Sequence, residues 1–112
     1  MSDSRADLLK GTLDLLVLQA LSGGPRHGYG VARWLEDSSR DLLRIEEGSL
    51  YPALYRMEER GWIRSEWGLS DSNRRARYYH ITDPGREQLR EQASAWERLV
   101  RAVALVFTEG AS

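Results

Sequence analysis

Residues 48–63 read GSLYPALYRMEERGWI, and this stretch decides the fold. Its apolar side chains recur at the spacing of one face of a helix. They are Leu50, Leu54 and Met57. The spacing predicts a helix from Leu50 to Arg60 that buries these three residues in a core.

Both ends of this helix carry sequence signals. Ser49 is expected to cap the first turn, because a serine hydroxyl accepts hydrogen bonds from free helix amides. Pro52 is expected within that first turn, where its missing amide does little harm. Gly61 can adopt the left-handed conformation that commonly ends a helix. The free amides beside Ser49 also predict a site for a phosphate group.

The opposite face of the same helix is polar and amphipathic. It carries Ser49, Tyr51, Tyr55 and Arg56. A helix in the major groove of DNA needs such a face, with hydroxyls for phosphates and arginine or tyrosine for base edges. The alternative is an ordinary solvated helix face with two surface tyrosines. Composition alone leaves both interpretations open.

Two segments with strand character follow, at residues 62–67 and 76–81. The polar residues 70–73 predict a turn that joins them into a hairpin. The hairpin carries a group of arginines that suits the phosphate backbone or the minor groove. They are Arg74, Arg75 and Arg77. The alternative is an edge strand protected by charge, and Arg77, which lies inside the strand, is the most readily assigned to a structural role.

Three further helices are expected around this region. Helical spacing predicts one at residues 8–21 and another at 27–39, and Thr82-Asp83-Pro84 predicts the start of a long one. The order helix, helix, helix, hairpin, helix is that of a winged helix-turn-helix with one added helix. We therefore expect a mainly α fold with a small β-hairpin (α+β). The expected organisation is a flexible N-terminus at 1–7, a winged helix-turn-helix DNA-binding domain at 8–82, a C-terminal dimerisation helix at 83–107 and a flexible tail at 108–112.

The last helix carries more apolar surface than so small a domain can cover. Leu89, Trp96 and Val103 recur every seven residues, as in a coiled coil. A partner subunit would supply the missing surface, with the first helix as its counterpart. The residues expected at this dimer interface are Leu13, Leu16, Leu89, Ala93, Trp96, Leu99, Val100, Val103 and Phe107.

Composition excludes several classes of protein. The chain has no cysteine, which excludes a disulfide framework and a thiol switch and fits a reducing cytoplasm. Its apolar runs are too short to span a bilayer, and its first residues lack the pattern of a signal peptide. No catalytic or cofactor motif appears and the histidines are isolated, so we expect no enzyme, no cofactor, no metal and no membrane partner. The net charge of −1 keeps a protein-interaction module as a competing hypothesis, which the arginines of the hairpin disfavour.

Several blocks of the sequence resemble the PadR family of bacterial transcriptional regulators. They are LKGTLDLLVL at 9–18, HGYG at 27–30, GSLYPAL at 48–54, EERGWI at 58–63 and RRARYYHIT at 74–82, followed by Gly85. Each block is short, but their order and spacing are specific, and the resemblance spans roughly residues 8–107. The chain is similar to the compact branch of that family, in which the C-terminal region is a single helix.

The resemblance implies a homodimeric repressor that binds an inverted-repeat operator in double-stranded DNA. It places the third helix in the major groove and the hairpin, or wing, on the backbone. The residues it assigns to DNA are Tyr29, Ser49, Tyr51, Pro52, Tyr55, Arg56, Arg74 and Arg75. For Tyr29, packing in the core is an equally good interpretation.

Trp96 has two interpretations. In some family members an aromatic residue on the C-terminal helix stacks a flat ligand between the subunits, which makes Trp96 a candidate for a small aromatic effector. The more common role of such a tryptophan is to pack the dimer. The operator sequence, the target genes and the way repression is relieved cannot be read from these residues.

Overall fold

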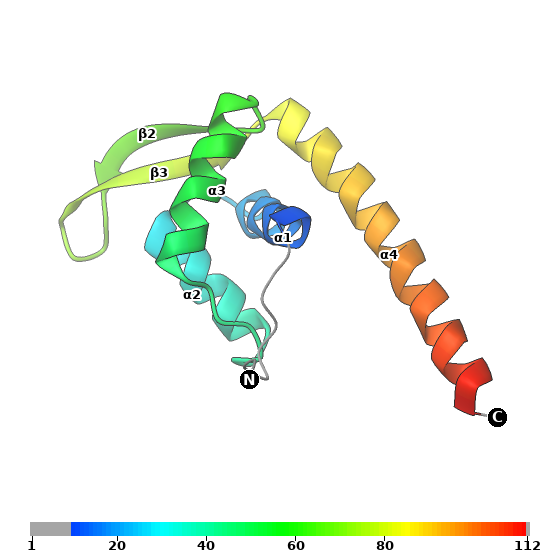
Figure 1. Ribbon diagram of the computed structural model, residues 1–112. Helices are drawn as coiled ribbons and strands as arrows, with labels where there is room; N and C mark the ends of the chain where they lie inside the picture. Colours follow the sequence, from blue (N-terminus) through cyan, green and yellow to red (C-terminus); the bar gives the residue numbers. More distant parts are fainter. Residues whose placement is uncertain (1–9, 112) are drawn as a thin grey trace.

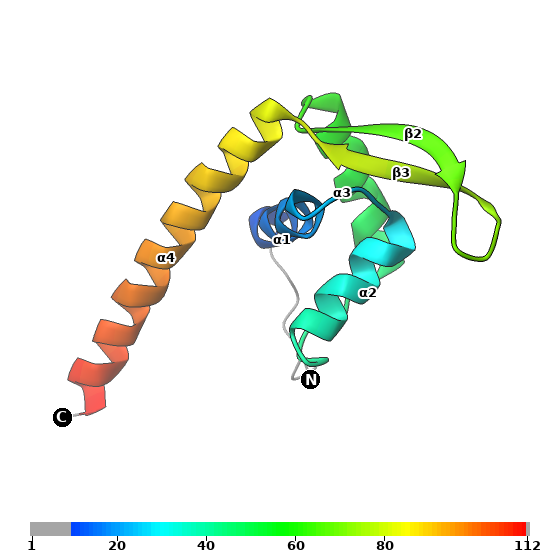
Figure 2. The same cartoon turned by 180° about the vertical axis from the view of Figure 1, so that it is seen from behind.

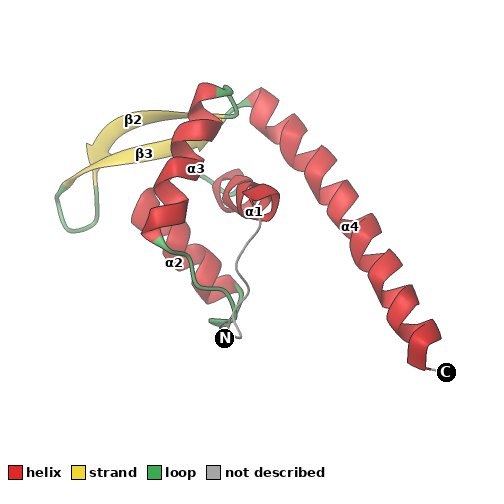
Figure 3. Ribbon diagram, viewed as in Figure 1, coloured by secondary structure: helices red, strands yellow, loops and turns green. Residues whose placement is uncertain are grey.

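The computed structural model describes residues 10–111. The elements are α1 (Lys10–Ser22), β1 (Arg26–His27), α2 (Gly28–Ser38), α3 (Glu47–Glu59), β2 (Ile63–Leu69), β3 (Arg75–Ile81) and α4 (Asp83–Ala111). Figure 3 distinguishes the helices from the small sheet. This order confirms the predicted α+β winged helix-turn-helix with an added C-terminal helix.

The helices α1, α2 and α3 form the body of the molecule. Figure 1 shows the wing, β2 and β3, projecting from one side of this body while α4 leaves from the other. The opposite view in Figure 2 shows the same arrangement, with the second half of α4 lying beside no other element. The molecule is elongated, with extents of 56, 32 and 21 Å, because the wing and α4 leave the body on opposite sides.

The sheet has three strands in the order β1-β3-β2, all antiparallel. The hairpin was predicted, but β1 was not. This strand has only two residues, with Arg26 opposite Tyr79 and His27 opposite Tyr78. A strand so short has no periodicity of its own, and it forms because β3 offers it an open edge.

The core consists of aliphatic side chains from all three helices of the body, closed on one side by the sheet. Its members include Val17, Leu18, Leu21, Val31, Leu50, Leu54, Met57, Ile63 and Tyr79. The predicted stripe of Leu50, Leu54 and Met57 is confirmed, since all three are fully buried. Burial of such side chains stabilises a fold by about 1.5–3 kcal/mol each.

Helix α3 begins earlier than predicted, at Glu47 instead of Leu50. Glu46 is its N-cap residue and makes no side-chain capping bond, so the prediction of Ser49 as the cap was wrong. Pro52 consequently lies in the second turn, where its missing N–H leaves the carbonyl of Gly48 without the usual donor. Both residues are exposed, and water can satisfy that carbonyl.

The junction between the wing and α4 is tightly built. The Oγ1 of Thr82 accepts a hydrogen bond from the amide of Gly85 at 3.1 Å and donates to the carbonyl of Gly61 at 2.6 Å, so the predicted cap is confirmed. A Cβ on Gly85 would overlap the carbonyl oxygen of Trp62. Only glycine allows the first turn of α4 to lie this close to the backbone that connects α3 to β2.

The remaining boundaries agree with the predictions to within a few residues. Helix α4 continues to Ala111, beyond the expected end at Phe107. The predicted N-terminal segment 1–7, and the expected helix start at Leu8, lie outside the described residues. Within residues 10–111 no helix has both the length and the apolar character needed to cross a membrane.

Candidate nucleic-acid interface

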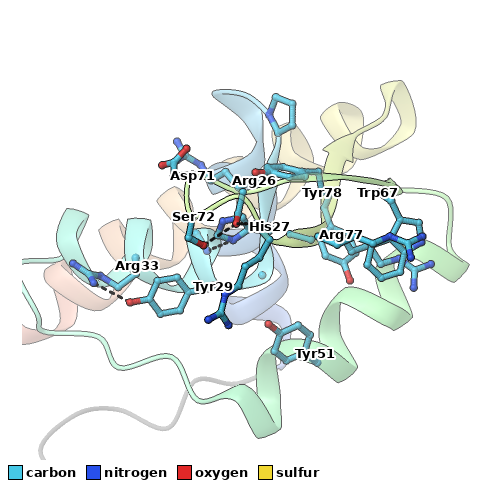
Figure 4. Close-up of a pocket in the computed structure, with 18 residues that line it drawn as sticks. Arg26, His27, Tyr29, Arg33, Tyr51, Trp67, Asp71, Ser72, Arg77 and Tyr78 are labelled. Atoms are coloured by element: carbon cyan, nitrogen blue, oxygen red, sulfur yellow. Dashed lines mark hydrogen bonds between the residues drawn. The ribbon is translucent and has the colours of Figure 1, made fainter.

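A hollow of about 1050 Å³ lies between the start of α2, the exposed face of α3 and the wing. Figure 4 shows Tyr29 and Tyr51 pointing into it from α2 and α3, with Trp67 and Arg77 on its wing side. Its lining combines arginine side chains with aromatic rings. That composition suits a polyanion with flat bases better than it suits an apolar ligand.

The exposed face of α3 carries four of the side chains assigned to DNA. Ser49, Tyr51, Pro52 and Tyr55 are all exposed, on the side of the helix away from the core. A hydrogen bond with Glu59 raises the pKa of the Tyr55 phenol. Tyr55 therefore stays a neutral donor and acceptor over the physiological pH range.

The amides of Ser49 and Leu50 are not the free donors that the sequence analysis expects for a phosphate. The amides of Ser49 and Leu50 donate to the carbonyl oxygen of Glu46, at 3.0 and 2.9 Å. The carboxyl groups of Glu46 and Glu47 stand at the same end of the helix. These two acids oppose an anion at this helix end, although the helix dipole by itself would favour one.

Arg56 lies elsewhere than the sequence analysis places it. Its Nη2 is 2.7 Å from Oδ1 of Asp14 on α1, and the side chains are 24% and 7% exposed. The guanidinium thus pairs with a buried carboxylate instead of joining the exposed face of α3. Position 56 lies at the edge of the buried stripe, and a long arginine side chain can reach the neighbouring helix from there.

Tyr29 is a surface residue, which resolves one open alternative. Its side chain is 61% exposed, so it is not part of the core. Its hydroxyl accepts a hydrogen bond from Nη1 of Arg33 at 3.1 Å, one turn along α2. The pair presents a hydroxyl and a guanidinium together at the rim of the hollow.

His27 fixes the first turn of α2 beside this pair. Its Nδ1 accepts a hydrogen bond from the amide of Gly30 at 2.9 Å, which makes His27 the N-cap of the helix. Its ring also lies edge-on to Tyr78 of the wing, with 5.3 Å between the centroids. His27 therefore joins the start of α2 to the sheet, and a cap from histidine was not anticipated from the sequence.

A close approach between two helices sets the position of Tyr51. A Cβ on Gly28 would lie 2.6 Å from the hydroxyl of Tyr51 and 2.7–2.8 Å from its ring carbons. The missing side chain of Gly28 thus leaves room for the Tyr51 ring against α2. Tyr51 lines both the large hollow and a smaller one of about 320 Å³ that it shares with Tyr55, Arg77 and others.

The wing carries its arginines in different settings. Arg74 and Arg75 are exposed near the turn at residues 70–74, and the guanidinium of Arg75 lies 4.4 Å from the centroid of the Trp67 ring. Arg77 instead donates from Nε to Oγ of Ser65 at 2.9 Å. Arg77 therefore has the structural role that its place inside the strand suggested.

Tyr79 marks the place where the wing joins the core. It is buried, and burial raises the pKa of its phenol, an effect that nearby Arg77 opposes and Glu58 reinforces. Glu58 on α3 is half-buried and accepts a hydrogen bond from Ser65 at 2.7 Å. The polar residues between α3 and the wing are thus engaged with one another.

The apolar residues of α4 divide into two groups. Leu89 packs against the core and Ala93 is half-buried, because the first half of α4 lies on α1. The second half exposes Trp96, Leu99, Val100, Val103 and Phe107, at 42–74%. The two α1 residues that were expected at the dimer interface pack within their own chain. Leu13 is only 6% exposed in the core of its own chain and Leu16 packs against that core, which leaves little of Leu13 for a partner.

Sequence reasoning missed several residues that shape this region. Asp14 is an isolated acid in an apolar helical run, and that isolation was the available signal for a buried ion pair. Trp67 and Ser65 alternate on one strand, a signal that they share a face. Among the described residues, no group of three or more metal-ligating side chains is placed to hold an ion.

Comparison with known proteins relates this geometry to a family. The model of the transcriptional regulator PadR-like family matches residues 17–91. Protein X of Lysinibacillus sphaericus is 30% identical over 95% of this chain and 96% of its own length. The transcriptional regulator Rv3488 of Mycobacterium tuberculosis is 41% identical over 62% of this chain and 65% of its own length.

Solved structures show the same fold. A PadR-like transcriptional regulator from Bacillus cereus has a TM-score of 0.77 and 31% identity, covering 91% of this chain and 97% of that one. A PadR family transcriptional regulator from Eggerthella lenta has a TM-score of 0.73 and 36% identity, covering 88% and 83%. Members of this family are DNA-binding transcriptional regulators and not enzymes. The chain belongs to the PadR-like family of transcriptional regulators.

Proposed function

We propose that this regulator is a homodimeric repressor that acts in the cytoplasm on an inverted-repeat operator in double-stranded DNA. The observation that carries the proposal is the hollow of about 1050 Å³ between α2, α3 and the wing, lined by arginines and aromatic rings. Tyr51 of the exposed face of α3 and the arginines of the wing, Arg74, Arg75 and Arg77, all belong to its lining.

In this proposal α3 enters the major groove. Tyr51 and Tyr55 contact base edges, while Ser49 and Pro52 lie against the sugar-phosphate wall. Tyr29, beside Arg33, contacts a phosphate at the rim of the hollow. Arg56 is not included among the base-reading residues, because Asp14 engages its guanidinium.

The wing binds the phosphate backbone through Arg74 and Arg75. Each phosphate contact of this kind releases counterions, so the logarithm of the binding constant falls by about 0.9 per contact for each tenfold rise in salt. Because the proposed dimer carries two wings, the double variant Arg74→Ala, Arg75→Ala removes four such contacts and should flatten this slope by about 3.6. Fluorescence anisotropy on a duplex selected from a random pool by the wild-type protein measures it.

A matched control removes two arginines of α4 that lie away from the hollow. Arg86→Ala with Arg90→Ala changes the net charge by the same amount, and both side chains are exposed. This control should shift the affinity slightly and leave the slope unchanged. Equal slopes for the wing variant and the wild type would show that the wing does not bind phosphates.

The second half of α4 is proposed to pair with a second copy of the chain. Its exposed apolar side chains form a contiguous stripe on a helix that no element of its own chain covers. Such a stripe is unfavourable in water and marks an interface. A second copy is the fitting occupant, because two identical heads held at a fixed spacing match the two half-sites of an inverted repeat.

Dimerisation can be tested on one helix with an internal control. Val103→Glu places a charge in the stripe, while Leu105→Glu places it on the other side of the same helix, where the side chain is also exposed. Sedimentation velocity should show monomers for Val103→Glu and dimers for Leu105→Glu. Dimers in both cases would refute this interface.

A small aromatic effector between the subunits is a further part of the proposal. Trp96 is 44% exposed on the stripe, so its ring is available to stack a flat ligand or to pack the partner. Titration with a flat dye should quench tryptophan fluorescence in the wild type and do so less in Trp96→Phe. Unchanged fluorescence in both proteins would leave packing as the role of Trp96.

A further inference from the structure

Three polar side chains link the wing to α3, and we call them the wing clamp. They are Glu58 on α3, Ser65 on β2 and Arg77 on β3. The Oγ of Ser65 donates to Oε2 of Glu58 at 2.7 Å and accepts from Nε of Arg77 at 2.9 Å. Nη2 of Arg77 also lies 3.9 Å from the same carboxylate oxygen. The clamp therefore connects one helix and both strands.

Arg77 also contacts the aromatic ring that Arg75 lies over. The guanidinium carbons of Arg75 and Arg77 lie 4.4 and 5.8 Å from the centroid of Trp67. Trp67 is directly opposite Arg77 in the hairpin, and Arg75 is two residues before Arg77 on the same face. Figure 4 shows Trp67 and Arg77 together on the wing side of the hollow. The Trp67 ring thus connects the wing clamp to Arg75.

The outer wing has little else to hold it. Strand β1 pairs only with Tyr78 and Tyr79, so β2 and β3 continue toward the tip as a two-stranded ribbon. Such a ribbon is marginally stable by itself and changes its angle easily. Side-chain links to α3 are what can fix that angle, and they lie on the face that carries Arg75.

We infer that Arg77 is a positioning residue, and that the wing clamp holds Arg75 at a set distance and angle from α3. The inference rests on the proposed function, in which Arg75 binds a phosphate while α3 lies in the groove. A preset wing binds more tightly because less conformational freedom is lost when DNA is bound.

The carboxylate of Glu58 provides a decisive test, because electrostatics and positioning predict opposite signs. A negative charge beside the DNA surface repels phosphate, so its removal alone should tighten binding. If Glu58 holds the clamp, its removal should weaken binding instead. Glu58→Gln keeps the size of the side chain and changes only its charge and acceptor strength.

Glu66→Gln is the matched control. Glu66 lies on β2 next to Ser65 and pairs with Arg64 at 3.2 Å. Its side chain belongs to the other face of the hairpin. Glu58→Gln should bind the selected duplex about three- to tenfold more weakly than the wild type. A loss of this size is typical when the interaction between two contacting side chains is removed. Glu66→Gln should bind as tightly as the wild type or more tightly.

Two further variants separate the effect of the wing's position from the effect of the side-chain charge. Ser65→Ala removes the bridging hydroxyl without changing any charge, and it should weaken binding to a similar extent. Arg77→Lys keeps the positive charge but lacks the Nε–H that bonds to Ser65, so it should weaken binding too. Thermal unfolding followed by circular dichroism verifies that each variant is folded at the assay temperature.

A measurement without DNA keeps the inference separate from the proposed function. Residual dipolar couplings of backbone amides in the free protein measure the orientation of the wing relative to α3. Glu58→Gln should reduce the couplings of the wing, because the wing then moves more freely against α3, while Glu66→Gln leaves them unchanged. If both variants match the wild type in these couplings and in affinity, the clamp does not position Arg75. If Arg75→Ala binds DNA normally, the phosphate assignment fails, and the couplings alone then decide the inference.

Discussion

Replacement of Arg56 by methionine tests whether this arginine stabilises the fold or reads bases. Met keeps the straight aliphatic stem of the side chain and removes the guanidinium that pairs with Asp14 at 2.7 Å. The structure therefore predicts lower stability and an unchanged base preference. The sequence pattern alone places Arg56 on the polar face of the helix, and it therefore predicts unchanged stability and an altered base preference.

The size of the effect follows from the burial of the pair. Removal of one partner from a fully buried ion pair costs about 3–5 kcal/mol, and exposed pairs contribute about 0–1 kcal/mol. Asp14 is buried but the Arg56 side chain is 24% exposed, which gives about 2 kcal/mol between these limits. For a domain of this size that corresponds to a decrease in Tm of about 8–16 °C.

Thermal unfolding at one fixed protein concentration measures the loss, since a dimer's Tm depends on concentration. Arg60→Met on the same helix is the control, because Arg60 is exposed and its contact with Trp62 contributes less than about 1 kcal/mol. The double variant Asp14→Leu, Arg56→Met should regain most of the stability, because it leaves no unpaired buried charge.

Base preference is measured by competition between the selected duplex and single-base variants of it. Arg56→Met should rank these duplexes as the wild type does, whereas Tyr55→Ala should lose discrimination of about 1–3 kcal/mol at one position. An altered ranking for Arg56→Met together with an unchanged Tm would refute the reasoning.

Three other substitutions have defined outcomes. Gly85→Ala should cost about 1–3 kcal/mol in urea unfolding, because its Cβ meets the backbone carbonyl of Trp62; a loss below about 0.5 kcal/mol would contradict the close packing. Gly28→Ala should change stability by less than about 1 kcal/mol yet weaken DNA binding, because Tyr51 must swing aside; unchanged affinity would remove Tyr51 from the interface. Burial raises the pKa of Tyr79 above 10.0. The stability that the neutral Tyr79 phenol contributes is therefore complete below pH 10.0 and is lost as pH rises through the higher folded-state pKa. Tyr79→Phe should therefore weaken the pH dependence of unfolding above pH 10.0, and an equally steep dependence would assign it to other groups.

The order of elements and the inner face of α3 were predictable because periodicity is a local property. Leu50, Leu54 and Met57 recur at helical spacing whatever they pack against, and their burial follows from that spacing. The turn at residues 70–73 is equally local, since its polar residues prefer a turn in any context. The exposed positions of Ser49, Tyr51 and Tyr55 follow from the same helix geometry.

Features that depend on distant partners were not predictable in this way. Strand β1 exists because Arg26 and His27 meet the open edge of β3, far along the chain. The start of α3 at Glu47 also departs from the favoured Ser49 cap. A cap is worth about 1 kcal/mol, and the packing of a whole helix outweighs such a preference.

The sequence by itself determined the elements, the buried stripe of α3 and the aromatic face opposite to it. Only the tertiary structure decided what each arginine does. Arg56 pairs with Asp14, Arg77 bonds to Ser65, and Arg75 lies over Trp67 in the open. These three guanidinium groups are chemically identical and their side chains are long. Their roles are therefore set by which partner lies within reach in space, and Asp14 is 42 residues from Arg56 along the chain.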